Sequence, residues 1–475
     1  MPAASSLGKI PALKRGIRFR DLVPFYVATV LSLRWTATAA AAGPSILVVW
    51  IASVSCFFLP LAASVMELSS RYPEEGGIYV WTREAFGDFS GFICAWTYWM
   101  CNLPFFASVL YFGAGSALFA FGTRAQVLNA NPVYYMTFAA FWLGAITLIN
   151  ILGVNAGKWL NNICALGVVL PLTALILMAA VSFWRFGPAV RYPPASFAPH
   201  WSLGNAVFWS SVFFAFAGTE SISAMADEIE NPRRTIPWAL LVAGAILTVG
   251  YVGGTAALLV ALPSDAVGGP DGFVNGVHVL SDRLGLTWLL APMALLVALN
   301  AIGGAAGNLS SSARLPFVAG VDRYLPAAFG WVHPRYRTPW VALAVYGGSG
   351  VLVALIGQAG TTVRGAYDVL VSMAIIANFL PYLFLFGAMI KMQRRPVGPE
   401  VRRVLGGRPV AILLASVGLA STALTIVLSA FPAHDDPNKP LAVAKVVGGT
   451  IVLVGAGVLV FVVERRRART HAPLI

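Results

Sequence analysis

Charged residues are scarce in this sequence. Lys, Arg, Asp and Glu make up 11% of the 475 residues, hydrophobic residues make up 58%, and the mean hydropathy is +0.77. Soluble domains carry about 25% charged residues. This composition excludes a soluble globular protein and indicates that nearly all of the chain lies in a lipid bilayer. The stretches between the hydrophobic runs are too short to form a separate soluble catalytic domain.

Cysteine and histidine are also rare. All four cysteines lie in or beside hydrophobic runs, so we expect no extracellular disulfide framework; they are Cys56, Cys94, Cys101 and Cys164. The five histidines fall in connecting segments or near the C-terminal end, without the spacing of a metal site; they are His200, His278, His333, His434 and His471. We therefore expect neither a bound metal nor a cofactor.

Long apolar runs, in contrast, are abundant. A transmembrane helix needs about 20 predominantly apolar residues. By this criterion the sequence predicts an all-α membrane protein with twelve transmembrane helices. They are expected at residues 22–42, 45–68, 91–121, 132–152, 160–184, 203–225, 236–261, 286–312, 339–356, 366–390, 409–431 and 441–463.

The net charge of +13 follows this topology. An even number of spans places both termini on one side, and that side holds 24 of the 32 Lys and Arg residues. Because positive residues collect on the cytoplasmic side, we predict a multi-pass protein of the cytoplasmic (inner) membrane with both termini inside. Residues 1–20 would be an uncleaved cytoplasmic arm and residues 464–475 a cytoplasmic tail. The charge then gives no reason to expect a nucleic-acid partner.

Two predicted spans are interrupted by polar residues. Residues 32–38 read SLRWTAT in the first span, and residues 214–221 read FAFAGTES in the sixth. Interruptions at matching positions of two halves are typical of inverted-repeat transporters, because irregular backbone at membrane depth is tolerated where it lines a cavity. We predict a first repeat at 21–184, a second at 203–391, and two further helices at 409–463. The alternative is local: Ser and Thr bonding to their own helix, and Ala-Gly serving close packing.

Arg34 is the one charged residue of the first span. A cationic side chain deep in a membrane costs a few kcal/mol or more, so such residues face a bundle interior or a water-filled cavity. Three interpretations stay open: Arg34 contacts a substrate, pairs with Glu220 of the sixth span, or extends toward the cytoplasmic vestibule.

Three motifs carry a resemblance to a known family. Residues 67–87 read ELSSRYPEEGGIYVWTREAFG, similar to E-L-x-x-x-x-P-x-x-G-G-x-Y. Residues 216–237 begin FAGTE and end EIENPRRTIP, similar to F-x-G-x-E followed by E-x-x-N-P-x-R-x-x-P. Residues 314–339 keep Arg314, the Leu-Pro pair and the Thr-Pro pair, although the family's Arg-Asp-Gly is not kept. From the first span to the tenth, the sequence resembles the amino acid–polyamine–organocation (APC) superfamily.

This resemblance implies a leucine-transporter-like 5+5 inverted-repeat fold with broken helices 1 and 6, alternating access, and a small amino acid, amine or related solute as substrate. Glu220 corresponds to a glutamate tied to proton-dependent steps in some antiporters of the superfamily, and Phe214 to an aromatic residue that closes the site from outside. The first span is similar to that of glutamate/GABA antiporters. It departs from many other members, which have a glycine-rich run there, and Val168 stands near where some proton-coupled relatives carry a lysine.

The candidate substrate site lies at the two interruptions. Free N–H groups at a half-helix N-terminus attract anions, and unwound C-terminal ends present carbonyls. We place a substrate carboxylate near the amides of Thr36 and Ala37, with Arg34 as a further partner, and an ammonium near the carbonyls of residues 215–218. The predicted substrate-binding residues are Ser32, Arg34, Trp35, Thr36, Ala37, Phe214, Ala215, Ala217 and Gly218, with Glu220 as the proton-coupling candidate.

The predicted function is a secondary active transporter, acting as an exchanger or a proton-coupled carrier of amino acids or related small solutes. One alternative is a sodium-coupled symporter of the same fold, with hydroxyls of Ser310 and Ser311 at the ion site. A channel and a polytopic enzyme or sensor rank below these carriers, and we expect no enzyme because the sequence shows no nucleotide-binding loop. The composition leaves the oligomeric state open.

Overall fold

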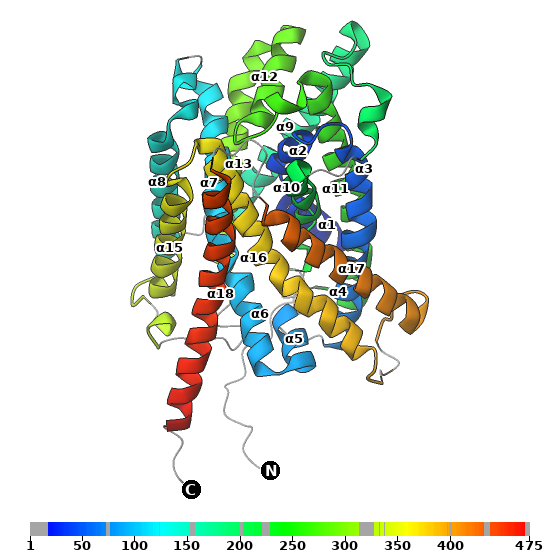
Figure 1. Ribbon diagram of the computed structural model, residues 1–475, viewed down its shortest axis with the longest axis vertical. Helices are drawn as coiled ribbons and strands as arrows, with labels where there is room; N and C mark the ends of the chain where they lie inside the picture. The colour runs from blue at the N-terminus through cyan, green and yellow to red at the C-terminus, as the bar shows by residue number, and fades with distance from the viewer. Residues whose placement is uncertain are drawn as a thin grey trace.

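The computed structural model describes residues 18–72, 77–122, 124–152, 157–199, 203–220, 229–312, 327–331, 333–336, 338–396, 398, 401–431 and 438–470. Over these ranges the chain forms α-helices joined by turns and short 3₁₀ segments (Figure 1), which confirms the predicted all-α class. The helices are α1 (Phe19–Val30), α2 (Leu33–Ala40), α3 (Ile46–Ser53), α4 (Leu59–Arg71), α5 (Ile78–Phe86), α6 (Asp88–Met100), α7 (Asn102–Leu118), α8 (Pro132–Ile151), α9 (Gly157–Phe186), α10 (Leu203–Phe214), α11 (Pro232–Ala261), α12 (Gly272–Leu284), α13 (Leu290–Ser312), α15 (Trp340–Gln358), α16 (Val363–Met392), α17 (Gly407–Ser429) and α18 (Lys439–Thr470).

Ten helical segments of the described chain are long and apolar enough to cross a membrane, and each matches a predicted span. They are Ile46–Arg71, Asp88–Phe121, Pro132–Ile151, Leu166–Phe186, Arg234–Ala261, Thr287–Leu309, Trp340–Gln358, Val363–Met392, Gly407–Ser429 and Lys439–Arg466. The two predicted spans without such a helix, 22–42 and 203–225, are those interrupted by polar residues. Their helices are short: α1 and α10 have 12 residues each, and α2 has 8. The total of twelve and the two five-helix repeats stay predictions.

The short helices lie inside the bundle. Helix α2 packs against α10, α11 and α12, while α10 also packs against α3, α16 and α17. All eight residues of α2 are buried, so its polar side chains do not face lipid. Figure 1 shows α2 and α10 near the middle, with the end of α18 at one end of the bundle and α12 at the other. We call these the terminal end and the α12 end.

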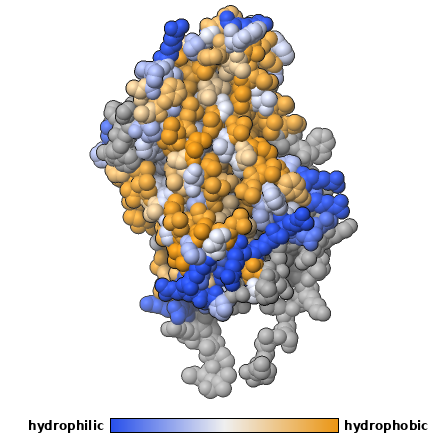
Figure 2. Space-filling model, turned by 90° about the vertical axis from the view of Figure 1, so that its right-hand side faces the viewer, coloured by the Kyte–Doolittle hydropathy of each residue, from blue (hydrophilic) through white to orange (hydrophobic). Residues whose placement is uncertain are grey.

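The surface follows the same axis. Figure 2 shows a broad hydrophobic belt along the bundle, with hydrophilic residues gathered at the terminal end and around the opposite end. Large apolar side chains of the long helices are exposed on this belt, for example Val249 on α11 and Ile451 and Val452 on α18. An apolar belt with polar ends is what a bilayer requires of a membrane-spanning bundle.

A proline shapes the helix pair α3 and α4. Five residues between them, Val54–Phe58, form a π-helical turn, which is a rare and local distortion of an α-helix. Pro60 has no N–H to donate to the carbonyl of Cys56, and that carbonyl instead accepts a hydrogen bond from Ser421 of α17 at 2.8 Å. Within the turn, Phe57 is fully buried and stacks on Phe379 of α16 with ring centroids 4.9 Å apart. The distortion therefore brings an aromatic ring toward the interrupted helices.

Candidate functional site

The first interruption lies at Leu31 and Ser32, where the polar run 32–38 begins. Both residues have extended backbone, with ψ of 118° and 125°, and helix α2 begins directly after them. Of residues 32–38, which the sequence suggested as the interruption, Ser32 lies in the break and residues 33–38 are helical. Consequently the free amides at the start of α2 belong to Leu33 and Arg34 rather than to Thr36 and Ala37, because the first N–H groups of a helix have no partner within it.

The second interruption follows Phe214. Residues 215–218 form turns, and Gly218 has φ of +98°, a conformation that residues with a Cβ rarely adopt. The amide of Gly218 donates to Tyr382 Oη at 2.9 Å and to Glu220 Oε2 at 3.1 Å. Residues 221–228, which include the end of the predicted polar run, lie outside the described part of the chain.

Tyr251 of α11 joins the two interruptions. Its hydroxyl lies 2.7 Å from the carbonyl oxygen of Val30 and 3.0 Å from that of Ala215, and it accepts a hydrogen bond from the amide of Ser32 at 3.2 Å. The ring is fully buried and stacks on Trp50 with centroids 4.6 Å apart. One hydroxyl therefore provides hydrogen bonds to backbone groups that the broken helices leave without helical partners. An unpaired backbone group at this depth would reduce the stability of the fold.

Arg34 lies beside this bridge and is 1% exposed. Its Nη1 donates to Ser108 Oγ of α7 at 2.8 Å. Its guanidinium carbon stands 4.1 Å from the ring centroid of Trp35 and 4.6 Å from that of Phe105, so two aromatic faces support the charge. Its Nε and Nη2 have no hydrogen-bond partner in the described part of the protein. A buried guanidinium with two unmet donor atoms is a strong site for a planar anion.

Two hydroxyls near Arg34 are also unsatisfied. Thr38 follows one turn after Arg34 on α2, and Tyr367 of α16 is an electrostatic neighbour of the guanidinium. The hydroxyls of Thr38 and Tyr367 lie near each other but do not form a hydrogen bond. Buried polar groups normally have partners, and those that lack one in a native structure need an explanation. Thr38 and Tyr367 thus add two unsatisfied hydroxyls to the two unsatisfied nitrogens of Arg34.

Aromatic rings pack beside Arg34. Trp35 meets Phe214 edge to face, with centroids 5.0 Å apart, and Phe214 lies 5.9 Å from Phe379. Trp35 is 3% and Phe214 7% exposed. Among the predicted residues, Arg34, Trp35 and Phe214 therefore come together. Thr36 instead donates its hydroxyl to Leu33 O of its own helix at 2.6 Å, and Ala37 packs beside the start of α12. The site is closed to solvent in this conformation.

Glu220 is 2% exposed and lies beside the second interruption, with its carboxylate fully engaged. Oε1 accepts from Tyr98 Oη of α6, and Oε2 accepts from Tyr382 Oη of α16, both at 2.8 Å. With the amide of Gly218, this carboxylate links three parts of the bundle. Arg34 and Glu220 do not form an ion pair in this structure, since the contacts of Arg34 are with Ser108 and two aromatic rings.

The remaining candidates are less well placed. Ser32 contributes its backbone amide to the Tyr251 bridge, and Ala215 contributes its carbonyl. Ala217 lies in the turn before Gly218 and is partly exposed. The backbone of Ser310 and Ser311 belongs to the end of α13, but their side chains lie outside what the structure describes, so the sodium-site prediction has no geometry.

Several site residues could not be found from the sequence. Five hydroxyl residues contact Arg34, Glu220 or the backbone of the interruptions, yet each lies within an apolar helix: Ser108, Tyr251, Tyr98, Tyr382 and Tyr367. Such residues commonly bond their own helix, and nothing in the local pattern separates those that reach across the bundle. Only their position in space reveals them.

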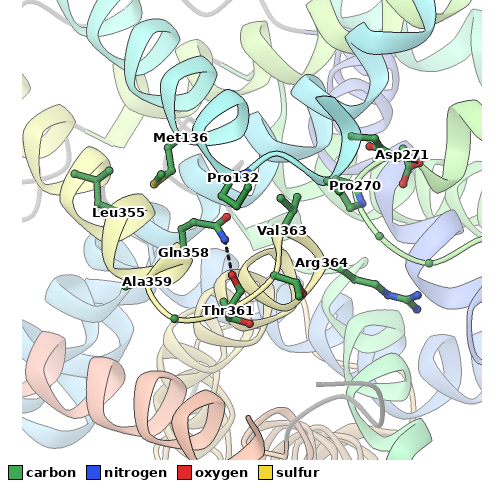
Figure 3. A pocket seen from close by; sticks show the side chains of 16 residues that line it. Pro132, Met136, Pro270, Asp271, Leu355, Gln358, Ala359, Thr361, Val363 and Arg364 are labelled. Atoms are coloured by element: carbon green, nitrogen blue, oxygen red, sulfur yellow. Dashed lines mark hydrogen bonds between the residues drawn. The ribbon is translucent and has the colours of Figure 1, made fainter. Parts of the chain in front are cut away.

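A separate cavity of about 1030 Å³ opens at the α12 end (Figure 3). It is lined by the start of α8, the segment before α12, the end of α15 and the start of α16. Gln358 donates to the carbonyl of Thr361 at 2.9 Å and accepts a hydrogen bond from the hydroxyl of Tyr111 at 3.2 Å. Asp271 and Arg364 add opposite charges to the lining of the cavity. None of the residues of the two interruptions lines it, so this cavity is distinct from the surroundings of Arg34.

Comparisons with known proteins agree with this architecture. The chain is 28% identical over 446 residues to an uncharacterized transporter of Legionella pneumophila, covering 93% of this chain and 95% of that one. It is 24% identical to the probable agmatine/putrescine antiporter AguD of Lactococcus lactis, covering 91% and 92%. Its fold resembles that of MhsT, solved in complex with L-phenylalanine, with a TM-score of 0.62, 14% identity and coverage of 88% and 99%.

The family assignment rests on nearly the whole length of the chain. A family model described as amino acid permease matches residues 19–455, from the start of α1 into α18. This range contains both interruptions, both buried charges and all ten membrane-spanning helices in full or in large part. The chain therefore belongs to the amino acid permease family and is a membrane transporter.

Proposed function

We propose that the protein is a secondary transporter of amino acids or related small solutes that bear a carboxylate, working by alternating access as an exchanger or a proton-coupled carrier. In this proposal its twelve spans comprise two inverted five-helix repeats and two further helices. It lies in the cytoplasmic membrane with both termini inside, as the distribution of Lys and Arg favours.

The observation that carries the proposal is the state of Arg34. Burying a charge without a full set of partners, as at Arg34, costs several kcal/mol. Such a residue within a membrane span is therefore expected at a functional site. A substrate carboxylate would meet Nε and Nη2 as a bidentate partner and would face the first amides of α2. The ring pair Trp35 and Phe214 would then exclude water from the contact.

The same residue argues against a substrate that is only cationic. The name of AguD assigns it agmatine and putrescine, which carry positive groups and no carboxylate. An amine placed against Arg34 would add a like charge in a buried site, and like charges at short range repel strongly where the dielectric constant is low. We therefore propose that this protein differs from AguD in substrate class, and that a substrate ammonium lies away from Arg34, toward the second interruption.

Glu220 is the candidate for proton coupling. It sits next to the second interruption, and its three hydrogen bonds depend on its acting as an acceptor. Protonation would remove part of that acceptor capacity and loosen the links to Tyr98 and Tyr382. The alternative role is a permanently ionised residue that only pairs the helices. The transport rate against pH, compared between wild type and Glu220→Gln at saturating substrate, distinguishes the two: profiles of the same shape would exclude Glu220 as the proton-sensing group.

Sodium coupling is the alternative of the same fold. The carbonyls at the helix interruptions are the kind of ligand that holds a cation in such transporters. Here the carbonyls of Val30 and Ala215 lie at hydrogen-bonding distance from the Tyr251 hydroxyl, which favours exchange or proton coupling over sodium at this position. Uptake driven by a sodium gradient at constant pH, and lost when potassium replaces sodium, would overturn this preference.

The decisive experiment uses purified protein in proteoliposomes. Uptake of labelled amino acids is measured with and without internal solute: an exchanger requires the internal solute, a proton-coupled carrier requires a pH gradient, and a channel requires neither. In parallel, thermal shifts with amino acids, agmatine and putrescine report binding. We expect Arg34→Lys to weaken binding of the stabilising amino acid about 10-fold, because the charge is kept but the planar fork is lost. Unchanged stabilisation in Arg34→Lys would refute the carboxylate contact.

A further inference from the structure

The segment 393–406 joins α16 to α17 at the terminal end of the bundle (Figure 1). We call it the α16–α17 connector. Together with the first turn of α17 it contains five arginines, and in the sequence only one acidic residue, Glu400, which lies outside the described residues. Positive charge is therefore concentrated at the end of two long apolar helices.

The inner side of the connector is fastened to α4 through its backbone. The amide of Arg402 donates to Ser70 Oγ at 2.7 Å, and the amide of Val404 donates to Glu67 Oε2 at 2.9 Å. Glu67 is 1% exposed and also accepts from Arg71 Nε at 3.0 Å and from Gln393 Nε2 at 2.6 Å. Residues 402 and 404 of the connector are therefore held against α4 by their backbone amides.

The outer side carries positive charge and one exposed apolar residue. Leu405 is 90% exposed, although its neighbour Val404 is buried. Arg402 and Arg403 are exposed, as are Arg394 and Arg408. The side chains of these four arginines form no ion pair or hydrogen bond with any residue that the structure describes. Arg395 differs, since it bonds the carbonyl of Glu84 at 3.0 Å.

The depth of these side chains is set by the helices. Arg394 follows the last residue of α16 by two positions, and Arg408 lies in the first turn of α17. Both helices cross the membrane, so the connector lies at the boundary between the bilayer and water. Figure 2 shows hydrophilic surface directly below the hydrophobic belt at this end. Phosphates of lipid headgroups occupy that level, and the acyl chains begin just inside it.

We propose that the described residues at the two ends of the α16–α17 connector, with the first turn of α17, form a binding site for anionic phospholipid headgroups. Arg402 and Arg403, with Arg394 and Arg408, bind the phosphates, and Leu405 inserts at the boundary of the acyl chains. Guanidinium groups suit phosphate because they donate in pairs. Basic residues at the membrane surface attract anionic lipids additively, and an apolar side chain adds affinity that a soluble anion cannot use.

This site has a consequence for the bundle. The backbone that presents the arginines is bonded to Glu67 and Ser70 of α4, and Glu67 is bonded to Gln393 after α16. A lipid that binds the connector in this arrangement stabilises the junction of α4, α16 and α17, because a ligand of the folded state raises its stability. The inference does not depend on which solute the protein transports.

The test uses the full-length protein in nanodiscs of phosphatidylcholine, with phosphatidylglycerol added in steps. The midpoint of thermal unfolding reports the lipid effect, and its dependence on phosphatidylglycerol content yields an apparent affinity. We expect phosphatidylglycerol to raise the midpoint of the wild type. Arg402→Gln with Arg403→Gln should weaken the apparent affinity about 25-fold, from about fivefold for each arginine at the membrane surface. Leu405→Ser should weaken it less.

The matched control is Arg465→Gln with Arg466→Gln, which removes the same charge from exposed positions of α18 at the same end. This control should keep the wild-type response, and inorganic phosphate should not reproduce the effect of the lipid. An unchanged response in the Arg402/Arg403 variant, an equal loss in the control, or equal stabilisation by inorganic phosphate would each overturn the proposal. Should the Arg402/Arg403 variant fail to fold in phosphatidylcholine, an unchanged response of Leu405→Ser would overturn it.

Discussion

The two interruptions each carry a buried charge, and the two charges are satisfied to different degrees. Glu220 has partners on both carboxylate oxygens, from α6, α16 and the turn at Gly218. Arg34 has one hydrogen bond, to Ser108, and two aromatic faces, while Nε and Nη2 have no partner among the residues described. A fully bonded charge holds a structure together, whereas an incompletely bonded one is completed by a ligand. On this comparison we propose that Glu220 belongs to the framework and its conformational change, and that Arg34 contacts the substrate.

The largest effect expected from this comparison is on stability at Glu220. Glu220→Ala would leave two buried tyrosine hydroxyls without their acceptor and would remove one of the two acceptors of the Gly218 amide. Hydrogen bonds to a charged group are among the stronger ones. We expect a loss of about 4 kcal/mol in the free energy of unfolding. Chemical unfolding of the substrate-free protein in detergent measures it. Glu220→Gln, which keeps one acceptor oxygen, is the control and should lose clearly less; a wild-type stability of Glu220→Ala would contradict the framework role.

Removing the charge of Arg34 is expected to leave the stability of the substrate-free protein unchanged or to raise it. Arg34→Met removes an incompletely bonded charge and keeps much of the apolar stem, so the substrate-free protein should unfold at the same temperature as wild type or higher. The stabilisation by a bound amino acid should disappear, corresponding to about 3 kcal/mol of binding. Arg364→Met in the cavity at the α12 end is the matched control and should keep the ligand response. If Arg34→Met destabilised the free protein strongly, Arg34 would be a framework residue like Glu220.

A smaller effect is expected at the bridge between the interruptions. Tyr251→Phe keeps the stacked ring but leaves the carbonyls of Val30 and Ala215 and the amide of Ser32 without the hydroxyl. We expect about 2 kcal/mol of lost stability together with a slower transport rate. Tyr111→Phe, which loses one hydrogen bond to Gln358, serves as the control. Transport in Tyr251→Phe at the wild-type rate would show that the two broken helices do not depend on this link.

The smallest expected effect is the coupling between the two charges themselves. Since Arg34 and Glu220 share no hydrogen bond or ion pair in this structure, a double-mutant cycle with Arg34→Met and Glu220→Gln should show a coupling energy below about 0.5 kcal/mol in the substrate-free protein. Repeating the cycle with bound amino acid reports whether the substrate couples them. Rescue of one single variant by the other in the free protein would restore the ion-pair interpretation of Arg34.

The interruptions were visible in the sequence, but their exact positions were not. Polar residues within apolar runs pointed to both, and the match at the sixth span is close, since α10 ends at Phe214 where the predicted run begins. At the first span the helix breaks at Leu31 and Ser32, at the start of the polar run, and the rest of the run is helical. The cause is tertiary: a hydroxyl from Tyr251, more than two hundred residues away, bonds the backbone on either side of Leu31 and stabilises the break there.

The sequence by itself determined the membrane setting, the all-α class and the two residues whose burial as charges is most informative. These follow from local hydrophobicity and from the high cost of a charge within an apolar run, neither of which depends on how the helices pack. Only the tertiary structure decided the partners of those charges. Ser108, Tyr98 and Tyr382 come from distant helices, and hydrogen bonding acts over about 3 Å in space regardless of separation along the chain.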